Sequence, residues 1–253
     1  MKIALLADIH GNDIALNSVL KDIKEQGGVD EYWVLGDLAA IGHAPVKVLE
    51  IINELPTIKV VRGNTDRYVC VGDRPNPTPE DVIADITLLE RLIEVEGDFS
   101  WTHGAITISG WLEWLSNLPI QFSEKLPDGT SALCVHASPN KDGGSGIHQK
   151  MSNDEVAALL LDCKEDLICV GHTHQPFSIH VKGKRIVNPG SVSNHFGPDV
   201  RACYAIIDAN EDGYGVEFYR VDYNCKKVIE ILEKINHPAK RFIIQHLRGE
   251  RIS

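Results

Sequence analysis

The residues of this 253-residue chain that could do chemistry are Asp, His and Asn side chains in five short segments, each directly after an apolar run typical of a strand. The segments are Asp8-Ile9-His10, Gly36-Asp37, Gly63-Asn64, His136 and Gly171-His172-Thr173-His174. Because ligands bind at the carboxyl ends of strands in open α/β sheets, segments far apart in the sequence can converge there. We therefore expect these side chains to form one site.

The spacing within two of the segments suits a metal ion. Asp8 and His10 are two residues apart, so in extended chain their side chains leave the same side and reach one ion. His172 and His174 repeat this spacing. A lone Asp-x-His or Gly-Asp is usually a turn, but the ordered set at successive strand ends favours a metal site. The expected ligands are Asp8, His10, Asp37, Asn64, His136, His172 and His174.

The donor atoms narrow the choice of metal. Carboxylate oxygen, imidazole nitrogen and one amide oxygen suit borderline divalent ions such as manganese, iron, zinc, cobalt or nickel. The six cysteines are not among these donors and contain no close Cys-x-x-Cys pair, which argues against a thiolate zinc site and suits a reducing cytosol.

The elements that must position these residues alternate between strand and helix. Ile3 to Ala7 is an apolar run followed by a helical pattern from about Asn12 to Glu25, and Tyr32 to Leu35 and Val46 to Leu55 repeat the pair. Alternation of this kind indicates a parallel or mixed sheet covered by helices. The length and the 43% hydrophobic content fit a single domain over residues 1–253.

A different pattern begins after Asp73. A proline-rich turn is followed by helical patterns through about Glu94 and again from about Ile106 to Leu118. We interpret residues 74–120 as a small helical cap inserted in the domain. Strands return further on, with antiparallel runs between residues 177 and 221 and a helical tail after them.

The overall charge limits the partners. The chain has 25 Lys and Arg residues against 36 Asp and Glu residues, a formal charge of -11, so its average surface repels nucleic acid and anionic membranes. The first apolar run is too short for a signal sequence, and no later run approaches the length of about 18 apolar residues that a membrane span needs. We expect a cytoplasmic protein without non-specific nucleic-acid binding.

The ordered motifs resemble the calcineurin-like metallophosphoesterase superfamily over about residues 1–192. Asp8-Ile9-His10-Gly11-Asn12 and Asn188-Pro189-Gly190-Ser191 are similar to its small bacterial and archaeal branch, which includes phosphodiesterases and some dinucleoside polyphosphate hydrolases. The resemblance implies an α/β fold, a four-layer αββα sandwich of two mixed β-sheets flanked by helices.

The resemblance also implies how two divalent ions, with manganese the first choice, share the ligands. Asp8, His10, Asp37 and His174 would hold one ion, and Asp37 would bridge to a second held by Asn64, His136 and His172. Asn12 would be an outer hydrogen-bonding residue that orients the ligands. Two carboxylates and a bridging hydroxide cancel three of the four positive charges, so the centre would attract a phosphoryl oxygen and deliver the hydroxide to phosphorus.

One departure from the family pattern leaves the proton donor open. Many members have a histidine after the Gly-Asn pair, whereas Thr65 and Asp66 follow Asn64 here. A threonine hydroxyl is too weak an acid, so Asp66 with a raised pKa, or a histidine from elsewhere, would have to protonate the leaving group. His148 is the first choice among the unassigned histidines. The alternative for Asp66 is a structural turn carboxylate.

Several functions remain open on these grounds. We expect a phosphoesterase that hydrolyses a phosphodiester or a nucleotide-type phosphate ester, with a dinucleoside polyphosphate hydrolase or a phosphomonoesterase as alternatives. A protein-binding scaffold is the non-enzymatic alternative, because a eukaryotic trafficking subunit shares this fold. Trp101, Trp111 and Trp114 of the cap are expected in the core, although a ring facing the metals could stack on a nucleobase. The substrate and any homo-oligomer are left open.

Overall fold

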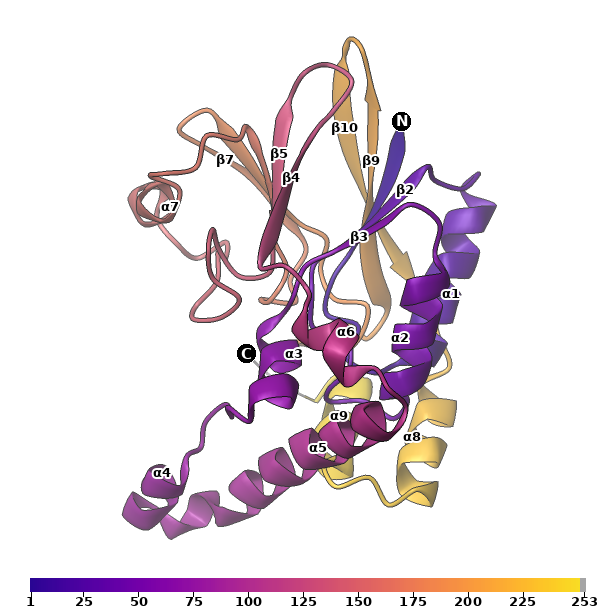
Figure 1. Cartoon of the computed structure of the whole chain (residues 1–253), viewed down its shortest axis with the longest axis vertical. Helices are drawn as coiled ribbons and strands as arrows, with labels where there is room; N and C mark the ends of the chain where they lie inside the picture. Colours follow the sequence, from indigo (N-terminus) through magenta and orange to yellow (C-terminus); the bar gives the residue numbers. More distant parts are fainter. Residues whose placement is uncertain (251–253) are drawn as a thin grey trace.

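The first strand, β1 (Lys2–Leu6), is buried on both faces, and this decides the layers around it. Side chains alternate along a strand, so Ile3 and Leu5 enter one apolar core while Ala4 and Leu6 enter another. The computed structural model describes residues 1–250 and places a second sheet against the first of these faces and helices against the other (Figure 1).

The first sheet has the strand order β10-β9-β1-β2-β3. Strands β2 (Glu31–Val34) and β3 (Ile58–Val60) run parallel to β1, whereas β9 (Ala202–Asn210) pairs antiparallel with β1 and with β10 (Gly213–Val221). The parallel strands therefore end at the same edge of this sheet.

The second sheet has the order β4-β5-β6-β8-β7. Strands β5 (Ser131–Val135), β6 (Leu167–Cys169) and β8 (Lys184–Asn188) are parallel, and β4 (Gln121–Lys125) and β7 (Phe177–Val181) are antiparallel at its two edges. Both sheets are mixed.

Helices cover the outer faces. On the first sheet lie α1 (Asp13–Glu25), whose buried residues recur at helical spacing, and α2 (Pro45–Glu54); α7 (Asn153–Leu159) covers the second sheet. The order helix, sheet, sheet, helix confirms the predicted four-layer fold. None of the helices within residues 1–250 has the length and apolar character needed to cross a bilayer.

The region predicted as a cap is helical throughout most of its length. It contains α4 (Pro79–Ala84), the short 3-10 helix η1 (Ile86–Leu88), α5 (Leu89–Ile108) and α6 (Leu112–Ser116), and α3 (Asn64–Val71) precedes it. The N-terminal half of α5, next to α4, extends away from the two sheets (Figure 1). Division of the chain into one domain with an inserted cap stays a prediction.

The two helical patterns predicted in the cap are wrong in their boundaries, because α5 is one helix of 20 residues. Gly97 in its middle resembles a break, but a Cβ there would lie 2.7 Å from Pro238 Cβ, so the glycine allows close packing against the C-terminal tail. The tail forms α8 (Cys225–Lys234) and α9 (Lys240–Leu247), and α9 contacts α5 through Phe242 and Arg91.

The cap tryptophans pack as expected for core residues. Trp111 and Trp114 meet edge to face with ring centroids 5.5 Å apart and contact the core beneath the first sheet. Trp101 packs on His237 of the tail at 4.6 Å. They therefore join the cap to the rest of the chain.

Leu5→Ala tests the core between the sheets. Leu5 is fully buried there, so we expect a loss of about 2–5 kcal/mol in the free energy of unfolding, measured by urea denaturation. The matched control is Leu161→Ala, since that side chain is 83% exposed and should change stability by less than about 0.5 kcal/mol. Equal losses in the two variants would contradict this assignment of the core.

Candidate metal centre

Five loops that follow β1, β2, β3, β5 and β6 meet where the two sheets end side by side. Backbone hydrogen bonds join them across long sequence separations: the Asp8 amide donates to Gly36 O at 3.1 Å, and the Gly171 amide to His136 O at 2.8 Å. These contacts bring all seven predicted ligands into one region, as expected from the strand ends.

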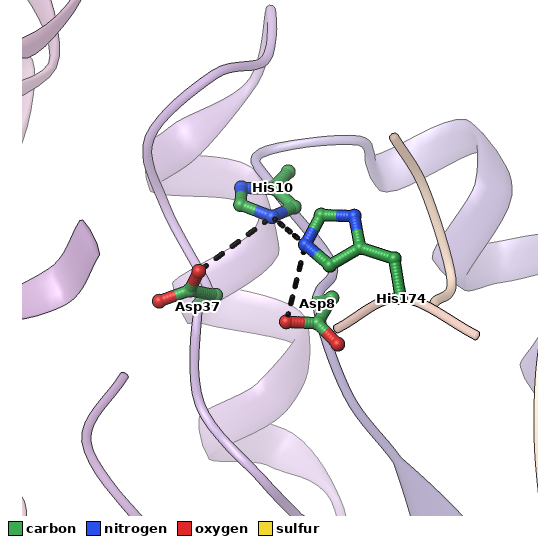
Figure 2. Close-up of side chains that lie close together, drawn as sticks. All are labelled: Asp8, His10, Asp37 and His174. Carbon is green, nitrogen blue, oxygen red and sulfur yellow. Dashed lines mark hydrogen bonds and ion pairs between the residues drawn. The ribbon is translucent and has the colours of Figure 1, made fainter. Parts of the chain in front are cut away.

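Four of these side chains form a first group (Figure 2). Donor atoms of Asp8, His10, Asp37 and His174 all lie within 4.8 Å of one another. The Nε2 atoms of His10 and His174 are 3.3 Å apart, with Asp8 Oδ1 3.5 Å from the latter and Asp37 Oδ2 3.7 Å from the former. This group has the size and the donor atoms to hold one metal ion.

The second group begins on the other oxygen of the same carboxylate. Asp37 Oδ1 is 3.4 Å from His136 Nε2, and Asn64 Oδ1 lies 3.1 Å from that nitrogen. His172 Nδ1 is 2.8 Å from Asn64 Oδ1 and 3.3 Å from His136 Nε2. Asp37 therefore stands between the two groups, each of its oxygens facing one of them.

Backbone carbonyls orient the four histidines. In each ring, the nitrogen away from the centre lies within hydrogen-bond distance of a carbonyl oxygen. The pairs are His10 Nδ1 with Ala40 O at 3.0 Å, His136 Nδ1 with Leu35 O at 2.5 Å, His172 Nε2 with Gly144 O at 2.8 Å and His174 Nδ1 with Asn194 O at 2.6 Å. A carbonyl only accepts, so these nitrogens carry protons, and in each ring that is neutral the opposite nitrogen presents a lone pair to the centre.

This orientation creates a demand for positive charge. Inward-facing ring nitrogens lie 3.3 Å apart in two places, between His10 and His174 and between His136 and His172. In addition, Asp8 Oδ2 is buried without a hydrogen-bond partner within residues 1–250. Burial lowers the pKa of His136, but Asp37 outweighs it and raises the pKa to about 10. Protonation of His136 is one way to supply the charge, and a divalent cation coordinated by the same nitrogens is the other.

Burial also affects the pKa values of two further ligands, Asp37 and His174. It raises the pKa of Asp37, but His136 and the other nearby histidines outweigh it and hold the pKa well below its usual range. Burial, followed by the neighbouring His10, lowers the pKa of His174 well below its ordinary value. An anionic Asp37 beside neutral His174 is the protonation pattern that metal ligands require.

The backbone of the centre is strained. Asp8, His10, Asp37, His172 and His174 all have φ between 48° and 66°, in the left-handed region that residues other than glycine rarely adopt. Such strain persists only where surrounding contacts hold it, and it is concentrated at functional sites. Five of the seven predicted ligands thus carry a mark of function that is independent of their side-chain chemistry.

Asp66, a predicted candidate for the proton donor, lies behind the centre. Its buried carboxylate accepts hydrogen bonds from the amides of Asp37, Leu38 and Gly63, all at 2.9 Å. Burial and then the charge of Asp37 raise its pKa to about 6. These bonds make Asp66 a positioning residue for the Asp37 loop, so its role as the acid stays a prediction that the geometry does not favour.

His148 and Asn12, the two other predicted residues, have different surroundings. His148 lines a cavity of about 310 Å³ that also reaches His172, so it is close enough to serve a substrate held there. Asn12 accepts from the Ala15 amide as the N-cap of α1 and donates to Ser193 Oγ at 3.0 Å. It therefore connects the first loop to the segment after β8.

That segment supports the centre in a way that the sequence did not reveal. Ser191 Oγ donates to Asp8 O at 2.9 Å, Asn188 Nδ2 donates to Gly171 O at 2.7 Å, and the carbonyl of Asn194 orients His174. The motif Asn188-Pro189-Gly190-Ser191 was a signal of family resemblance, but a backbone carbonyl that orients a ligand has no sequence signature.

Residues 1–212 match the sequence profile of the calcineurin-like phosphoesterase superfamily domain. The chain belongs to this superfamily. It is a hydrolase of phosphate esters, of a family that binds divalent metals.

Relatives agree over nearly the whole length. An uncharacterised protein of Methanocaldococcus jannaschii is 31% identical over an alignment of 258 positions, gaps included, that covers 93% of each chain. The crystal structure of a metallophosphoesterase from Sphaerobacter thermophilus superimposes with a TM-score of 0.74 at 26% identity, over 98% of each chain. A symmetrical bis(5'-nucleosyl)-tetraphosphatase from Cronobacter sakazakii is 30% identical over 124 residues, 42% of this chain and 44% of that protein.

Gly63→Ala tests the contact between two of the loops. A Cβ at Gly63 would collide with the amide nitrogen and Oδ1 of Asp37, so we expect Asp37 to move and the number of bound divalent ions to fall, measured by elemental analysis of metal-saturated protein. In the control, Gly104→Ala, the new Cβ meets nothing within 4 Å in α5, so metal content should stay the same and stability rise by about 0.5–1 kcal/mol. Unchanged metal content in Gly63→Ala would contradict the proposed position of Asp37.

Proposed function

We propose that this protein uses two divalent metal ions, with manganese the first choice, to hydrolyse a phosphodiester or a nucleotide-type phosphate ester. The observation that carries the proposal is the set of histidine lone pairs that face each other at 3.3 Å on both sides of the Asp37 carboxylate. Only positive charge makes such an arrangement favourable, and two cations satisfy both pairs at once.

The ligands divide between the two ions as the two groups divide in space. Asp8, His10, Asp37 and His174 would hold one ion; Asp37, Asn64, His136 and His172 would hold the other. When bound, two such ions polarise a phosphoryl group and lower the pKa of a water molecule so that hydroxide is supplied near neutral pH. The protein's own part is to hold the donors in place and to keep the ring tautomers fixed.

Two cavities support an ester with two organic groups. One of about 310 Å³ is lined by polar side chains that include Ser145, His148 and Lys150, and another of about 210 Å³ is lined by ligand-set residues and aromatic rings. Both reach His172 and Phe196, so they meet beside the centre. A phosphodiester can place one group in each cavity, whereas a monoester fills only one.

The leaving group belongs in the polar cavity, because His148 there can donate a proton to it. Asp66 is occupied with three backbone amides, and Arg67, which could contact phosphate, pairs instead with Asp142 and Asp73. We therefore assign proton donation to His148.

A dinucleoside polyphosphate is the second candidate substrate. The partial similarity to a symmetrical bis(5'-nucleosyl)-tetraphosphatase favours it, and such a molecule also has two arms around the reacting phosphorus. The two candidates share the metal chemistry and differ in the length of the phosphate chain between the arms.

Removing the metal ions and adding manganese back tests the proposal. Protein stripped by a chelator and titrated with manganese should bind two ions per chain and gain about 2.7 kcal/mol in unfolding free energy for each site at a free metal concentration of 100 times its Kd. It should then hydrolyse bis-p-nitrophenyl phosphate or diadenosine tetraphosphate faster than p-nitrophenyl phosphate. Asp37→Asn should lose metal and activity together, whereas the exposed control Asp162→Asn should keep both. Two bound ions without turnover of any of the three substrates would contradict the function.

The assignment of the acid predicts a dependence on the leaving group. His148→Gln should lower kcat by about 10²-fold or more for an alkyl diester, whose leaving group needs a proton, and far less for a p-nitrophenyl diester. His180→Gln removes an exposed histidine of β7 and should affect neither substrate. If His148→Gln slows both esters equally, His148 is not the proton donor.

A further inference from the structure

The smaller cavity beside the metal centre is built largely from aromatic rings of separate elements. It adjoins His10, Asp37 and His172 on one side, and its volume is about 210 Å³. The rings that line it come from α3, α5, the loop after β8 and α9, namely Tyr68, Phe99, Phe196 and Phe242. We call these four rings the aromatic wall.

The wall is ordered by contacts among the rings. Tyr68 and Phe99 meet edge to face with centroids 5.8 Å apart, and Phe196 lies 5.5 Å from the ring of His174. Phe242 packs edge to face on His246 of the same helix at 4.4 Å. The wall therefore reaches from the first ligand group to the C-terminal helix.

A guanidinium completes the cavity. The Arg91 Cζ atom lies 3.7 Å from the centroid of the Phe242 ring, and Arg91 is also a lining residue. Arg91 also forms an ion pair with Glu94, 3.7 Å away on the same helix. A flat cation stacked on a ring is a surface on which a further planar group can stack.

We propose that this cavity is the subsite for a planar ring of nucleobase type, carried by the group that remains on phosphorus after hydrolysis. The inference rests on the proposed function, because the metal centre must hold the phosphate to which that ring is attached. An alkyl chain or a bare sugar has no flat face to stack on an aromatic ring or on a guanidinium. A nucleobase can use both the aromatic wall and Arg91.

The test compares two ligands that differ only in the base. Binding of AMP and of ribose 5-phosphate to manganese-loaded protein is measured by calorimetry. We expect AMP to bind about tenfold more tightly, because stacking of one base on an aromatic side chain has an effect of this order. Equal affinities would overturn the proposal without the use of any variant.

Variants then locate the effect. Phe242→Leu keeps an apolar side chain but removes the ring, and it should reduce the ratio of the two affinities severalfold; Phe218→Leu makes the same change at an exposed position of β10 and should leave the ratio as it is. If Phe242→Leu does not fold, as judged by metal content and thermal unfolding, Phe196→Leu probes the same wall from the loop after β8. A ratio unchanged in the folded wall variant would overturn the assignment.

The binding test can succeed or fail independently of the proposed function, because binding needs no turnover. If the protein prefers AMP but hydrolyses no ester, the subsite is supported and the proposed reaction is contradicted. If the protein hydrolyses diesters but binds AMP and ribose 5-phosphate equally, only the subsite is contradicted.

Discussion

The rest of the structure depends on one electrostatic constraint, the approach of histidine lone pairs to 3.3 Å on either side of a shared carboxylate. Without positive charge this arrangement is repulsive, and it survives because each ring is held from behind by a backbone carbonyl. Carbonyl oxygens cannot donate, so they fix the tautomer as well as the direction of the ring. The centre is prepared for cations before any cation arrives.

Holding these carbonyls requires a rigid frame, which the two stacked sheets provide. Strands β1, β5 and β6 are buried on both faces, so their ends have little freedom to move. Loops only a few residues long then adopt left-handed backbone angles at Asp8, Asp37 and His172, and hydrogen bonds between loops hold them there. Asp66 contributes most directly, since three amides from two loops converge on its single carboxylate.

Local sequence patterns predicted a sheet covered by helices and, from donors at strand ends, the convergence of the ligands. The four-layer arrangement came from the resemblance to the superfamily. The sequence was not sufficient for contacts between remote segments that have no motif. Arg91 and Phe242 reach the site from a cap helix and from the last helix, and neither carries a signature of that role. Asn194 acts through its carbonyl, which every residue possesses, and the close packing of Gly97 against Pro238 joins two positions far apart in the chain.

Thr65 follows Asn64 where many members of the superfamily have a histidine, and this difference concerns both the aromatic wall and the choice of His148 as the acid. A histidine at that position would put an acid on the side of the site where the aromatic wall stands, and Thr65 puts there only a small hydroxyl without a hydrogen-bond partner among the described residues. The side of the centre freed in this way can accept a ring, while the polar cavity contains His148. Loss of the acid on one side and its presence on the other would give the two arms of a diester different roles, one to be bound through its ring and one to leave with a proton.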